Sequence, residues 1–242
     1  MSEPRLIKNV IITGKIRTVT GLHIGGNKGE LKIGGTDNPI IADNDGRPYI
    51  PGSSLKGKMR SLLEFSLGKV KEDGSVHSCD DKNCPICTIF GTSYEDFMNG
   101  PTRLIVRDAR LPKEEKPEVE LKTENVINRL SGKAAHPRIM ERVPPGVTFE
   151  MEMVYGIYKE GDYDGLKHVF QAMSLLQDSY LGGSGSRGYG KVAFEDISLK
   201  VKTVEDYSSA GAGRIVNIDG KITFSVGELL SGFEEVKSKI ME

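Results

Sequence analysis

The spacing of apolar residues divides the chain into a succession of strands and helices. Residues 9–20 alternate between β-branched and polar side chains and contain few turn formers, which predicts a β-strand. Apolar residues recur at helical spacing over 55–67 and over 164–180, which predicts two amphipathic helices. Strands are also predicted over 103–111 and 191–201.

Residues 118–158 are predicted to form a long segment of β-structure that extends away from this succession of strands and helices. A strand-like arm near 119–127 leads to a Gly- and Pro-marked tip over 131–137, and the chain returns through the alternating residues 147–158. Residues 68–100 are polar and contain the three cysteines, which indicates an inserted segment. The order β-α-β-β-α-β predicts an α+β fold, a ferredoxin-like (RRM-like) domain with an extended β-hairpin.

Charge is sorted along the sequence although it nearly cancels overall. The chain holds 33 Lys and Arg against 34 Asp and Glu, a net charge of −1, whereas proteins that bind polyanions are usually basic. Residues 47–60 nevertheless contain four cations and no acid, and residues 122–142 contain five cations and two acids. This sorting indicates a basic groove on a neutral protein.

The rest of the composition indicates the size of the domain and the compartment in which the protein is expected. Apolar residues make up 37% of the 242 residues, enough for the core of one large domain spanning 1–242. No apolar run approaches the roughly 18 residues of a membrane span, and no signal peptide is evident. The three clustered cysteines fit a reducing compartment, so we expect a cytoplasmic protein with no membrane partner. A Gly-rich linker over 210–213 and a helix over 227–240 are expected near the end.

The start of the first helix is a candidate phosphate site. Ser53 or Ser54 is expected to be the N-cap, and the free amides at a helix start attract anions. Lys56 and Arg60 are four residues apart and share one helix face, and Lys58 lies nearby. A solvated charged face is the alternative interpretation of these cations.

The glycine-rich stretch 182–190 is a second candidate phosphate site. Its glycine spacing is close to those of dinucleotide-binding and P-loop motifs, but both motifs require a strand before the loop and a helix after it. Here a helix precedes the loop and a strand follows it, so nucleotide binding is not expected. We expect a flexible run of exposed amides beside Arg187 and Lys191 that lies against a phosphate backbone. A plain glycine linker is the alternative.

Four residues of metal-binding types crowd one short stretch of the insertion, in the pattern His77-x-Cys79-x4-Cys84-x2-Cys87. This set of soft and borderline ligands suits a tetrahedral zinc ion. Four protein ligands would leave no position for water, so a structural zinc that stabilises the insertion is predicted. Asp80 or Asp81 could complete the site in place of His77, and three reduced thiols without metal are the alternative.

Two long blocks of sequence, IPGSSLKGKMRSLL at 50–63 and YLGGSGSRGYGKV at 180–192, carry a family resemblance. With them the chain resembles the backbone subunits of type III-A CRISPR effector complexes, within the RAMP superfamily, over about residues 1–200. The shorter matching motifs are TGLHIGG (20–26), DNPII (37–41), FG (90–91), EN.I.R (124–129) and PR..ER (137–142).

The resemblance implies a palm with a thumb hairpin, which would span 118–148, and a zinc-binding insertion over 68–100 that only some relatives have. It implies that copies of the chain form a helical filament on guide CRISPR RNA, together with other subunits of the type III-A complex. Each thumb would interrupt the duplex of guide and target RNA, and the target would be cut beside each interruption.

The resemblance also implies which residue cuts. In the family, an acid in the first Gly-rich loop is needed for a metal-dependent reaction, and this acid matches Asp37. A carboxylate near the scissile phosphate suits Mg or Mn. Without the resemblance, Asp37 would be interpreted as a turn residue.

The resemblance further places His23 in an RNA-facing loop and three arginines in the thumb. Combined with the candidates from the charge pattern, the predicted RNA-binding residues are His23, Ser54, Lys56, Lys58, Arg60, Arg129, Arg138, Arg142, Gly183, Ser184, Gly185, Ser186 and Arg187. Two features depart from the family: Asn128 stands where relatives often have an acid, and residues 203–242 match no motif.

Two other functions remain open. A purely structural scaffold would bind guide RNA and cut nothing, and Asp37 is the feature that argues against it. A RAMP-type endonuclease that processes guide precursors would need a general base near the RNA, for which His23 is the only candidate.

Overall fold

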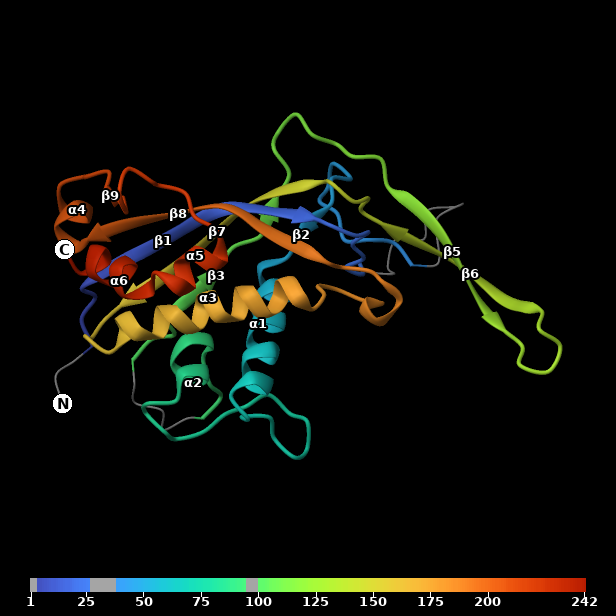
Figure 1. Cartoon of the computed structure of the whole chain (residues 1–242), viewed down its shortest axis with the longest axis horizontal. Coiled ribbons are helices and arrows are strands. Elements are labelled where there is room, and N and C mark those ends of the chain that lie inside the picture. Colours follow the sequence, from blue (N-terminus) through green and yellow to red (C-terminus); the bar gives the residue numbers. More distant parts are fainter. Residues whose placement is uncertain (1–3, 27–37, 95–99) are drawn as a thin grey trace.

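The computed structural model describes residues 4–26, 38–94 and 100–242. It has an α+β fold in which a large antiparallel sheet carries the main helices on one face, and a two-stranded hairpin extends from one end (Figure 1). The predicted α+β class is therefore confirmed. Among the described residues, no helix is long and apolar enough to cross a membrane.

The first long strand, β1, lies at the centre of the sheet. It pairs with β7 on one side and β8 on the other, so that Val10, Ile12 and Ile16 point into the core and are fully buried. The seven strands are arranged in the order β2-β4-β7-β1-β8-β9, with β3 also paired to β7. Their bounds are β1 Lys8–Thr18, β2 Tyr49–Ile50, β3 Leu104–Val106, β4 Ala109–Arg110, β7 Thr148–Ile157, β8 Val192–Thr203 and β9 Arg214–Ile215.

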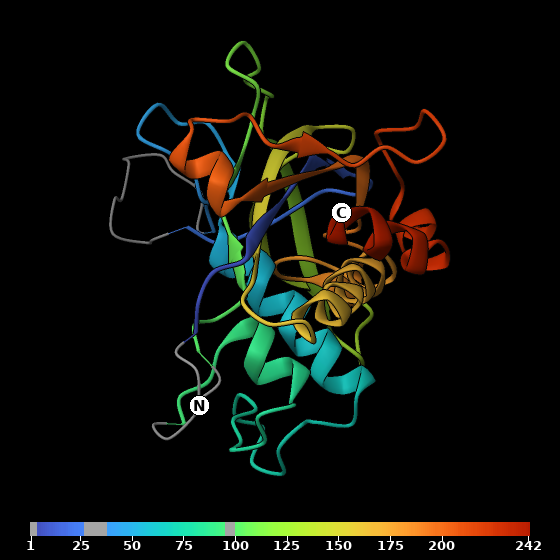
Figure 2. The same ribbon diagram turned by 90° about the vertical axis from the view of Figure 1, so that its left-hand side faces the viewer.

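Two amphipathic helices cover the buried face of the sheet, as Figure 2 shows. Helix α1 (Gly52–Ser66) and helix α3 (Asp162–Asp178) pack against each other, and each buries an apolar stripe at helical spacing. Both helices were predicted from that spacing. Helix α2 (Pro85–Phe90) lies in the segment that was expected to be inserted, and it buries Ile86, Ile89 and Phe90.

The C-terminal segment closes one edge of the sheet. A short helix α4 (Val204–Ser208) follows β8, and β9 then pairs with the outer side of β8. The single helix predicted over 227–240 is instead two helices, α5 (Val226–Ser231) and α6 (Phe233–Met241), because Gly232 interrupts them. Lys8 is buried, and its Nζ donates to the carbonyls of Ile240 and Met241 at the end of α6.

The predicted strand over 103–111 is broken into the short strands β3 and β4. Between them, the Asp108 carboxylate accepts a 2.9 Å hydrogen bond from the Gly52 amide at the start of α1. Residues 107–108 are therefore not part of a strand, and Asp108 instead binds the start of α1. This tertiary contact has no signature in the local apolar pattern.

The hairpin consists of β5 (Glu120–Ile127) and β6 (Ala134–Arg142), which form a separate two-stranded sheet. The sequence predicted its outward strand but assigned the return to 147–158, which is wrong because that stretch is β7 of the main sheet. Strand β6 was missed because few of its side chains are buried and it contains Pro137, so it shows no apolar alternation.

A buried ion pair joins β3, β7 and α3 at the far end of the molecule from the hairpin. Arg103 Nε lies 2.9 Å from Asp162 Oδ2, and both side chains are nearly inaccessible to solvent. The same carboxylate accepts hydrogen bonds from the amides of Tyr158 and Lys159 in the loop between β7 and α3. Asp162 thus bonds to three donors at this junction, and the Arg103 guanidinium is the one that is fully buried.

We expect Asp162→Ala to lower the free energy of unfolding by about 3–5 kcal/mol, because it leaves the Arg103 guanidinium buried without its counterion. Chemical denaturation of the purified protein measures the change. Glu152→Ala is the matched control, since Glu152 pairs with Arg107 on the exposed surface and should cost about 0–1 kcal/mol. Equal losses in the two variants would contradict this assignment.

Candidate metal site and nucleic-acid interface

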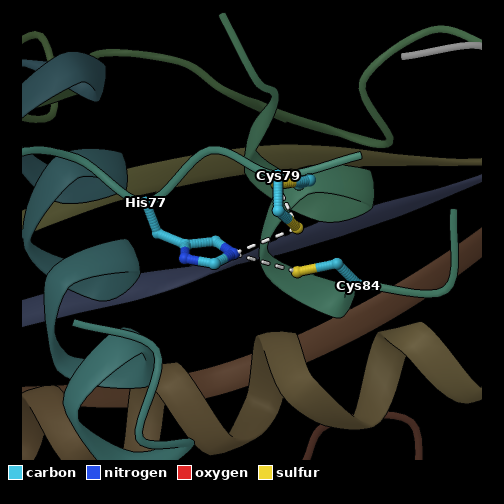
Figure 3. Close-up of side chains that lie close together, drawn as sticks. His77, Cys79 and Cys84 are labelled. Carbon is cyan, nitrogen blue, oxygen red and sulfur yellow. Dashed lines mark hydrogen bonds between the residues drawn. The ribbon is translucent and has the colours of Figure 1, made fainter. Parts of the chain in front are cut away.

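The four predicted metal ligands converge at one point beside α2, and Figure 3 shows three of them, His77, Cys79 and Cys84, pointing toward one another. His77 and Cys79 come from the loop before the helix, Cys84 is its N-cap residue and Cys87 lies in its first turn. Their ligand atoms all lie within 4.8 Å of one another. His77, Cys84 and Cys87 are buried, so the sequence prediction that His77 belongs to the group is consistent with the geometry.

The separations between these atoms fit a tetrahedral ion. His77 Nε2 lies 3.3 Å from Cys79 Sγ and 3.4 Å from Cys84 Sγ, and Cys79 Sγ lies 3.7 Å from Cys87 Sγ. Nitrogen and thiolate ligands at normal zinc distances would lie about 3.5–3.8 Å apart at the corners of a tetrahedron. This cluster could therefore hold a metal ion, and its ligand set is closed to water.

The start of α1 differs from its prediction. The N-cap residue is Pro51, and neither Ser53 nor Ser54 is a side-chain cap. Instead, Asp108 accepts the hydrogen bond from the Gly52 amide, so a carboxylate already lies where a phosphate was expected to bind. The prediction of free amides at this helix start is wrong for Gly52.

The three cations of α1 have partners within the protein. Lys56 Nζ donates to the Leu104 carbonyl, and burial together with the nearby Arg60 charge lowers the pKa of Lys56. Arg60 pairs with Glu64, which lies just beyond the stretch that lacks acids. Lys58 Nζ lies 3.7 Å from the ring centroid of Tyr180, at the end of α3. Of the three, Lys58 is the one whose partner is itself exposed.

The glycine stretch after α3 is ordered and closely packed, which corrects the expectation of a flexible loop. Gly182 has a φ of +75°, and a Cβ there would lie 2.2 Å from the His23 carbonyl oxygen. The Gly183 amide donates to that same oxygen, and the Gly190 amide donates to Gly21. A short 3₁₀ turn over Gly185–Arg187 lies between these anchors and leaves Ser186 and Arg187 exposed.

His23 connects the first loop, the glycine stretch and the hairpin. Its ring is buried, with Nδ1 2.7 Å from the carbonyl oxygen of Glu141 on β6. Its own carbonyl accepts the Gly183 amide at 2.9 Å. The structure therefore places His23 beneath this surface, where its ring acts as a structural link.

The base of the hairpin gathers cations around an aromatic ring that the sequence analysis did not single out. Lys122 Nζ lies 4.5 Å and the Arg142 guanidinium 5.2 Å from the Tyr189 ring centroid. Burial and the neighbouring Glu124 carboxylate raise the pKa of Tyr189. Tyr180 precedes the glycine stretch and Tyr189 lies near its end, and these positions beside the glycines are the signal that could have identified them.

Glu124 is the acid at the centre of this cluster, and its side chain is only 9% exposed. Its Oε2 lies 3.1 Å from Arg187 Nε and 3.9 Å from Arg138 Nη2. The ion pair between Glu124 and Arg187 thus links the hairpin to the glycine stretch. Arg129 lies apart from them at the hairpin tip, where it donates to the Ile127 carbonyl.

Asp37, the predicted cutting residue, lies outside the described residues. The chain resumes at Asn38, which bridges to Met140 on β6 and whose carbonyl accepts the Glu141 amide. The Glu141 carboxylate in turn accepts the Ile40 amide at 3.1 Å. The residue that follows Asp37 is therefore attached to the hairpin base.

Comparison with known proteins agrees with these features. A family model described as the RAMP superfamily matches residues 15–193. The chain belongs to the RAMP superfamily. The match covers the end of β1, both long helices, the hairpin and the glycine stretch, which are the elements that build the surface described above.

Individual RAMP relatives are similar over nearly their whole length. The chain is 52% identical over 217 residues to the CRISPR system Cms endoribonuclease Csm3 of Methanocaldococcus jannaschii, covering 86% of this chain and 87% of that protein. It is 46% identical over 227 residues to the protein of the same name from Methanothermobacter thermautotrophicus, covering 84% and 90%.

A solved structure is also similar to this chain. It is a chain from the crystal structure of the Csm3–Csm4 subcomplex in the type III-A CRISPR-Cas interference complex, at 37% sequence identity and a TM-score of 0.66. The similarity covers 96% of this chain and 97% of that one.

We expect Gly182→Ala to destabilise the protein by at least about 2 kcal/mol more than Gly188→Ala. Both glycines have positive φ, but only at Gly182 would the new methyl group meet the backbone, since no atom lies within 4 Å of a Cβ at Gly188. Denaturant midpoints and RNA affinity of the two variants measure the difference. Equal effects would show that the contact with His23 does not hold this loop.

Proposed function

We propose that this chain is the RNA-binding backbone subunit of a type III-A CRISPR interference complex and cuts target RNA within that complex. The observation that carries the proposal is the convergence at the hairpin base of the chain next to Asp37, the glycine stretch and β6. Relatives of high identity are named as endoribonucleases, and a similar chain is part of a type III-A subcomplex.

The proposed architecture is a ferredoxin-like palm with the hairpin as its thumb. The palm would consist of β1, α1, the β3–β4 pair, β7, α3 and β8, whose spatial order β4-β7-β1-β8 corresponds to 2-3-1-4 in the chain. That arrangement supports a ferredoxin-like assignment. Residues 1–242 would then form one domain, with a thumb over 118–148 and an insertion over 68–100.

The proposed partners are guide RNA, target RNA, further copies of the chain in a filament and other subunits of the complex. Guide RNA would lie along the glycine stretch, with the half-buried Lys58 and the exposed Arg187 at its phosphates. The remaining predicted contacts, His23 apart, lie in the glycine stretch, at the hairpin and on α1. We propose a cytoplasmic setting, since reduced thiols are needed to hold a metal.

Zinc is the metal we propose for the four-ligand cluster. The three sulfurs and one imidazole nitrogen match its preferred donors, and the closed shell indicates a structural role. The cluster would stabilise a segment that has only one short helix of its own.

Asp37 is the proposed catalytic residue. A lone carboxylate is a poor general base near pH 7, because its ordinary pKa is about 3.9. It is a good ligand for Mg or Mn, which when bound would stabilise the negative charge that develops on the phosphate. The chain's own part would be to hold this carboxylate near the hairpin base, to which the next residue, Asn38, is attached, and where target RNA would lie against the thumb.

We expect Asp37→Ala to slow cutting of target RNA by about 100-fold or more, equivalent to about 3 kcal/mol of barrier. Assembly and RNA binding should persist, because the residue's role is in the reaction. Cleavage assays with the reconstituted complex test this. Asp45→Ala is the control, since Asp45 is an exposed acid of the following turn. Wild-type cutting by Asp37→Ala would favour the scaffold function instead.

We expect Lys58→Ala and Arg187→Ala to weaken binding to RNA of any sequence by similar factors, because phosphate contacts do not read bases. Each loss should reduce the salt dependence of log K by about 0.7 for single-stranded RNA. Titrations at several salt concentrations measure both quantities. Lys15→Ala on the sheet surface is the matched control. Variants that bind like the wild type would place the guide elsewhere.

A further inference from the structure

An ion pair within α1 encloses the backbone of one metal-ligand residue. Arg60 Nε lies 2.7 Å from Glu64 Oε1, and the two side chains are only 16% and 10% exposed. The Arg60 Nη2 group donates to the His77 carbonyl, and the His77 amide donates to the same Glu64 oxygen at 3.3 Å. Both polar groups of the His77 backbone are therefore bonded to the pair.

This arrangement restricts the direction of the His77 side chain. With its amide and carbonyl both held by α1, the peptide on each side of His77 has little freedom to rotate. The imidazole then extends from a fixed backbone toward Cys79 and Cys84, as Figure 3 shows. Cys84 and Cys87 need no such support, because they are positioned by α2 itself.

We infer that Arg60 and Glu64 are positioning residues for the metal site, holding His77 in place as its nitrogen ligand. The inference rests on the proposed metal binding and extends it by assigning Arg60, which the charge pattern placed among the RNA contacts, to the metal-binding segment. Groups that orient a metal ligand commonly change metal affinity by 10- to 100-fold when they are removed.

An ordinary helix pair would not have this geometry. Exposed Arg and Glu four residues apart add little to a helix, and they have no reason to reach a loop 13 residues further on. Here the pair is largely buried and each member bonds to His77. If the pair only stabilises the fold, a stable variant without it should bind the metal normally. If the pair holds His77 in place, such a variant should bind the metal more weakly.

The test uses the full-length protein without RNA. Zn²⁺ affinity is measured by competition with a chromophoric chelator, and the visible spectrum of bound Co²⁺ reports whether nitrogen completes the three-sulfur shell. Glu64→Gln should lower Zn²⁺ affinity about 10- to 100-fold and alter the Co²⁺ spectrum. Glu72→Gln, an exposed acid in the same segment, is the control and should match the wild type.

A double variant separates positioning from stability. Replacing Arg60 with Met and Glu64 with Leu removes the pair but keeps an apolar filling of similar volume, a change that often preserves stability. We expect it to unfold near the wild-type denaturant concentration yet to retain the weakened affinity and altered spectrum. Wild-type affinity and spectrum in the variants would overturn the inference while leaving the metal proposal intact. A wild-type protein that binds neither ion would overturn both.

Discussion

The close approach of two backbones at Gly182 and His23 determines how the surface of this protein is built. A side chain at residue 182 would collide with the His23 carbonyl, so the glycine permits a contact that no other residue allows. The same carbonyl accepts the Gly183 amide, and the His23 ring binds the β6 backbone. Three segments distant in sequence are therefore held at one place, which becomes the base of the hairpin.

Charged side chains surround these backbone contacts at the base of the hairpin. The buried Glu124 is matched by Arg187 from the glycine stretch and Arg138 from the hairpin, and the Tyr189 ring lies between Lys122 and Arg142. Glu124 thus pairs with two of these cations and Glu120 pairs with a third, Arg142, so acids of the hairpin offset part of the repulsion between the cations. The near-zero net charge of the whole chain does not reveal this local grouping.

The sequence predicted the elements whose own residues determine them. The long helices and β1 were identified because their apolar stripes face the core, and the metal ligands because they are close in sequence. Strand β6 could not be found, since it is mostly exposed and carries no alternation. The cap of Gly52 by Asp108 was equally invisible, because 56 residues separate the partners.

The features of the site that the sequence did not predict also depend on contacts between segments that are distant in the chain. Glu64 lies only four residues after Arg60, but its bond to His77 depends on how the insertion folds back. The buried position of His23 likewise depends on β6 and the glycine stretch. A pattern of residue types indicates which groups are present, and long-range packing decides which of them remain available to a ligand.

The segment after β8 has a consequence for how copies of the chain can meet. Strand β9 pairs with Lys200 and Val201, and the Phe224 backbone bridges to Ile197, so the outer side of β8 already has hydrogen-bonding partners along part of its length. The buried Lys8, on the central strand β1, donates hydrogen bonds to the carboxyl end of the last helix, α6. The sheet therefore ends on this side at β9, which is only two residues long. A very short edge strand offers few hydrogen-bonding groups to a strand of another molecule, which disfavours the continuous sheet growth that leads to fibrous aggregates.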